Sequence, residues 1–132
     1  MALVNKLFLL EFLHYPLNKT PNYLPNFENL NNLRVLSVFD NSFYGKLPVQ
    51  IGNLSKLQEL SLANNLFEGQ IPSELSKLTS LEILLLNNNR FNGTISNEIK
   101  NLPNLMALEY GNNPRPVEVT ANPVSQTTMT PQ

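Results

Sequence analysis

One stretch of the sequence has the residue types that often line phosphate or metal sites. It reads LANNLFEGQIP, residues 62–72, and a close copy, LNNNRFNGTIS, occupies residues 86–96, 24 residues later. A phosphate cradle needs a glycine-rich loop between a strand and a helix, followed by Lys and then Ser or Thr. Gly69 and Gly93 each stand alone in their copy, without that context. The two copies are therefore better explained as a structural repeat than as a phosphate site.

Acid–base chemistry would depend on carboxylates and on the single histidine. Glu59, Glu82 and Glu109 recur near the same place in successive copies, and paired acids of this kind can act as general acid and base. No residue spaced to position them is evident, so we interpret them as a solvated face. His14 has no Asp or Cys spaced for a triad, and we interpret it as a surface residue. The sequence therefore predicts a protein that is not an enzyme and binds no cofactor or metal.

Length and composition narrow the remaining classes. The 132 residues suffice for one modest domain, with 42% hydrophobic and 14% charged residues. The nine Lys and Arg are dispersed and the formal net charge is -1, which argues against nucleic acid or anionic lipid as a main partner. Cysteine is absent, so disulfide frameworks and thiol catalysis are excluded. The longest apolar run near the start is too short to span a bilayer, and no transmembrane segment is predicted.

A 24-residue period organises most of the chain. Leucines recur in the frame Leu-x-x-Leu-x-Leu-x-x-Asn, which at about 20 to 29 residues is typical of a leucine-rich repeat. One degenerate copy, three full copies and a half copy lie at residues 7–29, 30–53, 54–77, 78–101 and 102–113.

Outside the array the sequence loses its period. The predicted organisation is a short lead at residues 1–6, the repeat array at 7–113, and a tail at 114–132 that is rich in Pro, Thr, Gln and Val. We interpret this tail as a flexible extension.

Each copy is predicted to form one coil of a solenoid. Leu60 and Leu62 alternate with residues of the opposite face, which indicates a short strand with one buried side. Each buried Leu contributes roughly 1.5–3 kcal/mol, which offsets the ordering of a coil only when neighbouring coils cover it. The predicted fold class is therefore an α/β-type solenoid, with a short parallel sheet on the concave face and turns and 3-10 segments on the convex face.

The recurring asparagine is predicted to be structural. Where the chain turns after the strand, its amide supplies donors and an acceptor for backbone groups that lack strand partners. The members of this predicted ladder are Asn18, Asn41, Asn65, Asn89 and Asn113.

The extension Asn-x-Phe-x-Gly-x-Ile-Pro, present as NNLFEGQIP and NSFYGKLP, resembles the plant-type leucine-rich repeat. That class fills the ectodomains of receptor-like kinases, receptor-like proteins and polygalacturonase inhibitors. The resemblance covers about residues 7–113 and implies a right-handed superhelix, a second short strand near GQIP and GKLP, and an extracellular or cell-surface role in signal perception. Such ectodomains usually carry cysteine-paired caps, whereas this chain has neither cysteine nor a convincing signal peptide. It thus looks like a truncated or degenerate relative, with its compartment left open.

Function is expected at the outward strand positions of the concave face. Apolar residues there, such as Phe39, Ile83 and Leu85, are the kind of anchor found in interface cores. No paired arginines occur at strand positions, so a site for a free peptide carboxylate is not predicted. The candidate ligand-binding residues are Val35, Ser37, Phe39, Glu59, Ser61, Ala63, Ile83, Leu85 and Asn87.

Three hypotheses follow for the function. The first is a non-catalytic module that recognises a protein or peptide ligand, with a co-receptor as a further partner class. The second is an enzyme inhibitor resembling the polygalacturonase inhibitors, and the third is a non-functional receptor fragment.

Three N-glycosylation sequons start at Asn18, Asn53 and Asn92. Asn18 is expected to face inward as a ladder residue. Asn53 and Asn92 are expected on outer turns, where glycosylation is possible if the chain is secreted.

Overall fold

A computed structural model describes residues 30–113 and 118–119 of the chain. The lead at 1–6 and the degenerate repeat at 7–29, including His14 and Asn18, lie outside the described residues. The described elements are β1 (Val35–Ser37), β2 (Tyr44–Lys46), η1 (Val49–Asn53), β3 (Glu59–Ser61), β4 (Leu66–Gln70), η2 (Ser73–Lys77), β5 (Ile83–Leu85), β6 (Arg90–Asn92), β7 (Thr94–Ile95), α2 (Asn97–Lys100), β8 (Ala107–Glu109) and β9 (Glu118–Val119), where η marks a 3-10 helix.

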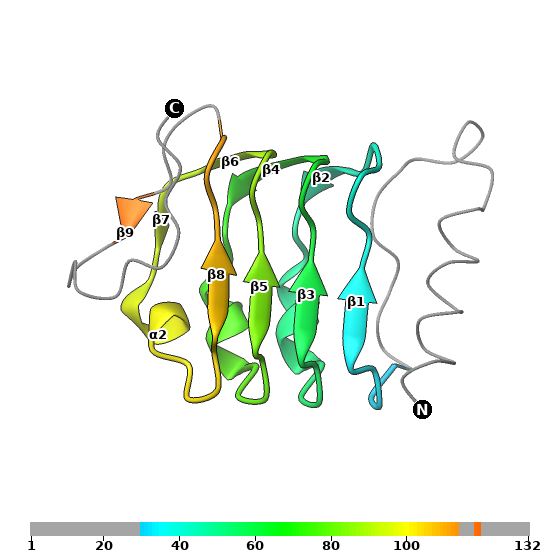
Figure 1. Ribbon diagram of the computed structural model, residues 1–132, viewed down its shortest axis with the longest axis vertical. Coiled ribbons are helices and arrows are strands. Elements are labelled where there is room, and N and C mark those ends of the chain that lie inside the picture. The colour runs from blue at the N-terminus through cyan, green and yellow to red at the C-terminus, as the bar shows by residue number, and fades with distance from the viewer. Residues whose placement is uncertain (1–29, 114–117, 120–132) are drawn as a thin grey trace.

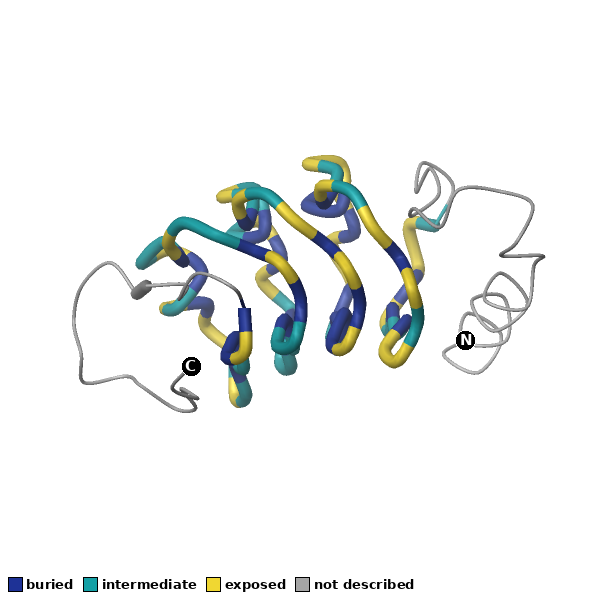
Figure 2. Tube along the Cα trace, turned by 90° about the horizontal axis from the view of Figure 1, so that it is seen from above, coloured by how far each residue is buried: buried dark blue, intermediate teal, exposed yellow. Residues whose placement is uncertain are grey.

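Sheet A is parallel and takes one strand from each coil, in the order β1-β3-β5-β8. Its register advances by one repeat per strand, so Val35 pairs with Glu59, Glu59 with Ile83, and Ile83 with Ala107. The strands lie side by side across the front of the molecule (Figure 1), and the coils stack along a gentle arc (Figure 2). The register predicted from the 24-residue period is confirmed.

Sheet B lies behind sheet A and is built from β2, β4 and β6, also in parallel (Figure 1). This is the second strand that the family resemblance implies. Gly69 in β4 has φ +81°, a conformation that side chains disfavour, and a Cβ there would lie 2.9 Å from Lys46 Cγ. The glycine therefore serves the turn and leaves room for the lysine stem of the preceding coil.

The convex side is formed by short helical turns, as predicted. Pro48 and Pro72 precede η1 and η2 with extended backbone and no side-chain cap. In the third full copy the proline is replaced by Ser96, whose hydroxyl accepts a bond of 3.3 Å from the Ile99 backbone N–H. That cap is followed by the α-helical turn α2 in place of a 3-10 turn, in line with the preference for Ser at helix N-termini. No helix in the described part of the chain is long and apolar enough to cross a membrane.

The core runs the length of the array between the two sheets and the convex turns. The repeat leucines are fully buried, as for Leu36, Leu60 and Leu84. Phe43, Phe67 and Phe91 stack through it, with ring centroids 6.2 Å apart at each step. The central coil, residues 54–77, therefore shares its core with both neighbours, as expected when a single repeat cannot bury its own apolar face.

Gly52 marks the closest contact between successive convex turns. A Cβ at this position would lie 2.5 Å from the backbone oxygen of Glu74 in η2. Because a backbone atom cannot rotate away, we expect Gly52→Ala to lower the free energy of unfolding by about 2 kcal/mol, measured by urea denaturation. Ser76 occupies the equivalent position one repeat later, so Ser76→Ala is the matched control and should change stability by less than about 0.5 kcal/mol. Equal stability of Gly52→Ala and wild type would contradict the close contact.

The strand pairing continues beyond the repeat period. Residues Glu118–Val119 form β9, which pairs in parallel with β7, aligning Thr94 with Glu118 and Ile95 with Val119. These two residues belong to the predicted tail, and they pair without the leucine motif because a parallel pairing needs only the open edge of β7.

Candidate functional site

Three of the predicted ladder asparagines lie in the interior, at the turns between sheets A and B. Asn65, Asn89 and Asn113 are buried, and each accepts a bond from a backbone N–H of the preceding coil, at Phe43, Phe67 and Phe91 respectively. Their amide groups also donate to backbone carbonyls, as in the 2.8 Å bond from Asn89 Nδ2 to the Leu62 oxygen. These side chains are used within the scaffold and are closed to a ligand.

Asn41 stands at the start of the described ladder and is only partly buried. Its Nδ2 donates to the backbone oxygens of Val38 and Phe39, both at 3.0 Å. Its amide thus makes the same local bonds as the other ladder members.

A second column of residues was missed by the sequence analysis. Asp40, Asn64, Asn88 and Asn112 all have left-handed backbone conformations, with φ between 58° and 61°. Asn and Asp tolerate this conformation better than other residues that carry a side chain. Asn64 Nδ2 also donates to Asp40 Oδ1 at 2.6 Å. The signal was present in the sequence, since an Asn or Asp comes directly before every ladder asparagine from Asn41 onward.

The concave face, defined here as the outward side chains of sheet A and of the residues flanking its strands, brings the candidate ligand-binding residues together. Strand pairing aligns Ser37, Ser61, Leu85 and Glu109 in one column beside the column that starts at Val35. A third column follows from the backbone bonds Asp40 N to Ala63 O and Asn64 N to Asn87 O, which place Phe39, Ala63 and Asn87 side by side. All nine candidates therefore lie on one surface.

Apolar side chains on this face are partly open to solvent. Phe39 is 54% exposed, and Val35, Ile83 and Leu85 are half-buried. Met106, which directly precedes β8, is 71% exposed and was not among the sequence candidates. It holds the same place in its coil as Arg34, Gln58 and Glu82, a position at the entry to each strand.

Two candidates are less accessible than predicted. Ser61 is only 4% exposed and Ala63 only 7%. Their side chains are short, and the strand register places them between longer neighbours, with Leu85 beside Ser61 and Phe39 beside Ala63. Both lie at outward positions of the sheet but present little surface, and together they form the low centre of the concave face.

The carboxylates do not form an acid pair across neighbouring strands. Glu59 aligns with Ile83, and Glu109 aligns with Leu85, so each column holds a single glutamate with an apolar residue beside it on β5. Within the described residues, no group of three or more His, Cys, Asp or Glu side chains is arranged to hold a metal ion.

The two described sequon asparagines lie in different settings. Asn53 is exposed at the end of η1, as predicted for an outer turn. Asn92 instead belongs to strand β6 and is half-buried, so its assignment to a turn is wrong. The reason is that the glycine after it, Gly93, bends the chain only once the strand has ended.

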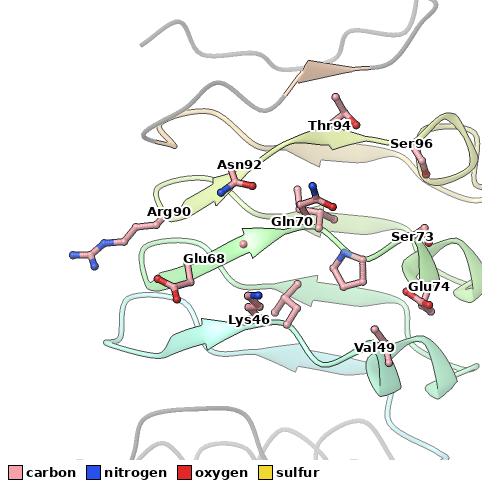
Figure 3. A pocket seen from close by; sticks show the side chains of 14 residues that line it. Lys46, Val49, Glu68, Gln70, Ser73, Glu74, Arg90, Asn92, Thr94 and Ser96 are labelled. Carbon is pink, nitrogen blue, oxygen red and sulfur yellow. The ribbon is translucent and has the colours of Figure 1, made fainter.

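A hollow lies outside the concave face, along sheet B and the adjacent helical turns. It is open, has a volume of about 940 Å³, and is lined mainly by polar side chains (Figure 3). Lys46, Glu68 and Arg90 form a row of alternating charge across its strands, and Figure 3 shows the Arg90 side chain extending away from the hollow. Glu74 also lines the hollow, so its two cations are balanced by two carboxylates and it offers no net charge to a ligand.

The stacked strand–turn coils, with an asparagine ladder inside and variable side chains on a concave sheet, define a repeat solenoid. The family described as Leucine Rich Repeat matches at residues 32–54, 56–78 and 80–102. The chain belongs to the leucine-rich repeat family, and its repeats are of the plant type.

Solved structures similar to the chain are plant receptor ectodomains. The LRR ectodomain of the receptor kinase SOBIR1 from Arabidopsis thaliana is 31% identical, with a TM-score of 0.70 over 76% of this chain and 54% of that one. The BIR2 ectodomain from the same plant is 30% identical, with a TM-score of 0.65 over 73% and 49%. The Arabidopsis receptor kinase HAESA, solved with the peptide hormone IDA and the co-receptor SERK1, is 33% identical, with a TM-score of 0.60 over 64% and 14%.

The chain thus spans about half the length of the SOBIR1 and BIR2 ectodomains. No curated protein matches its sequence.

Proposed function

We propose that this chain is a non-catalytic recognition module whose concave face binds a peptide or protein. The observation that carries the proposal is the set of partly exposed apolar side chains at Val35, Phe39, Ile83 and Leu85, all on one sheet face. Such side chains cost free energy in water and become favourable contacts when a partner covers them.

The separation of scaffold residues from outward-facing residues within each coil supports the same conclusion. The ladder asparagines, the stacked Phe43, Phe67 and Phe91, and Gly69 hold the turns and the core, so they are not free to bind. The residues at outward strand positions differ from coil to coil, as in Val35, Glu59, Ile83 and Ala107. A rigid scaffold that presents a variable surface suits specific recognition.

The similarity to HAESA adds support for the partner class. That receptor kinase was solved with a peptide hormone and a co-receptor. We extend the peptide class to this chain, with a co-receptor as a second partner.

A selection from a displayed random peptide library on the full chain tests the proposal. We expect Ile83→Lys, Leu85→Lys and Phe39→Lys each to raise the Kd of a selected peptide at least tenfold, measured by fluorescence anisotropy, because truncating or charging an interface anchor costs about 2 kcal/mol or more. The melting temperature should stay within a few degrees of wild type, since these side chains are outside the core.

Val49→Lys is the matched control, because Val49 is a similarly exposed apolar residue on the convex side, in η1. It should leave the Kd unchanged. Peptides whose binding is insensitive to all three concave variants would contradict a concave site.

A further inference from the structure

Charge is distributed unevenly over the concave face. Glu59 and Glu109 project from β3 and β8, and Glu82 lies at the entry to β5. Among the described residues of this face and its strand entries, Arg34 is the cation, and it lies beside β1 at the N-terminal end. Three carboxylates against one guanidinium make the part of the face over β3, β5 and β8 acidic.

The two strand glutamates lie on a diagonal across the sheet. Glu59 is in the column of Val35 and Ile83, whereas Glu109 is in the column of Leu85, two strands away. Two strand spacings are about 10 Å, and a step of two residues along a strand is about 7 Å. The Cα atoms of the two glutamates are therefore about 12 Å apart.

The midpoint of this diagonal is apolar. It falls on β5, between Ile83 and Leu85, both of which are half-buried with part of their surface in solvent. Glu59 and Glu109 thus lie on either side of an apolar ridge formed by Ile83 and Leu85. This arrangement selects a ligand by the spacing of its charges and its apolar group, which a charged patch alone does not.

An extended peptide has a matching repeat. Its side chains at i, i+2 and i+4 share one face, and the outer two lie about 13 Å apart. The flexible stem of a lysine or arginine covers the difference of about 1 Å from the glutamate spacing.

Building on the proposed concave-face function, we propose that the preferred ligand is an extended peptide with basic residues at i and i+4 and an apolar residue at i+2. The basic residues pair with Glu59 and Glu109, and the apolar residue packs on Ile83 and Leu85. Glu82, at the entry to β5, also attracts the basic residues of the peptide. Arg34, beside β1, repels them from that side of the face. The peptide therefore lies over β3, β5 and β8, and a peptide of the opposite charge is disfavoured.

A set of short labelled peptides tests this inference on the full 132-residue chain. The probe contains Lys-Ser-Leu-Ser-Lys with capped ends. Comparison peptides replace both Lys by Glu, replace Leu by Ser, or delete one Ser so that the second Lys moves to the opposite face. Fluorescence anisotropy at about 50 mM salt keeps charge attraction measurable.

We expect the Lys peptide to bind at least tenfold more tightly than the Glu peptide, and more tightly than the other two. Glu59→Gln and Glu109→Gln should each weaken it about two- to fivefold, the range of exposed ion pairs, and the double variant about tenfold. Glu98→Gln is the matched control, because Glu98 is exposed on the convex side in α2, and it should leave affinity unchanged.

Equal binding of the Lys and Glu peptides, no saturable binding up to about 1 mM, or insensitivity to both glutamate variants would overturn the inference. The library selection separates this failure from failure of the proposed function. Selected peptides that depend on Ile83 and Leu85 but lack paired basic residues would leave the concave site in place and remove only the charge pattern.

Discussion

Asn89→Ala is expected to lower the free energy of unfolding by about 3–4 kcal/mol. The buried amide makes four bonds, accepting from Phe67 N–H at 3.0 Å and donating to the backbone oxygens of Leu62, Leu86 and Asn87. The main cost is expected at the Phe67 N–H and the Leu86 carbonyl, which lose the bonds from this amide, and an unsatisfied buried group costs about 1–3 kcal/mol. Urea denaturation followed by far-UV circular dichroism measures the change.

The other two carbonyls are less affected by this substitution. The Leu62 oxygen also accepts from Asn65 Nδ2 at 3.1 Å, and the Asn87 oxygen also accepts from the Asn64 backbone N–H at 3.0 Å. The ladder is therefore shared between coils, so that each amide supports its own turn and that of the coil before it.

Asn89→Asp distinguishes hydrogen bonding from space filling. Aspartate has the shape of asparagine and keeps the acceptor for Phe67 N–H, but its carboxylate would face three carbonyl oxygens inside the protein. We expect a loss at neutral pH at least as large as for alanine. Asn53→Ala, at an exposed turn, should change stability by less than about 0.5 kcal/mol. A well-tolerated Asn89→Asp would contradict the structural role of the amide.

The backbone of the array could be predicted from the period of the sequence. In a solenoid each coil repeats the one before, so equal steps along the sequence become equal steps in space. The pairing of Leu36, Leu60 and Leu84 across sheet A follows from this rule alone. The asparagine of each coil falls at the same turn for the same reason.

Side-chain exposure on the concave face could not be predicted in the same way. The period places Ser61 and Ala63 outward, but their burial depends on the size of the side chains on neighbouring strands. Whether a position is open is thus a property of several coils together.

Features outside the repeat motif were also missed, for two different reasons. The left-handed backbone conformation of Asn64 was overlooked because the adjacent ladder residue, Asn65, accounted for the recurring asparagine motif. The residue type of Asn64 nevertheless fits that conformation. Strand β9 carries no motif, because it depends on pairing with β7 at the edge of the array.

Phe67→Ala is expected to have the largest effect on stability, a loss of about 4 kcal/mol in the free energy of unfolding. The ring is 1% exposed and stacks between Phe43 and Phe91, with interplanar angles of 8° and 5°. Removing it leaves a cavity that both adjoining coils line, and Phe→Ala substitutions in cores cost about 3–5 kcal/mol. Urea denaturation measures the loss.

Phe67→Leu keeps most of the apolar volume and should cost much less, on the order of 1 kcal/mol. A small effect of Phe67→Ala, below about 1 kcal/mol, would show that the coils do not depend on the stack.

The expected large effect has a consequence for the concave face. Sheet A is held in its arc by contacts between successive coils, and Phe67 lies in the coil that carries Glu59. Loosening that coil should therefore weaken peptide binding even though the ring touches no ligand, because the spacing of Glu59 and Glu109 depends on the stacking between them.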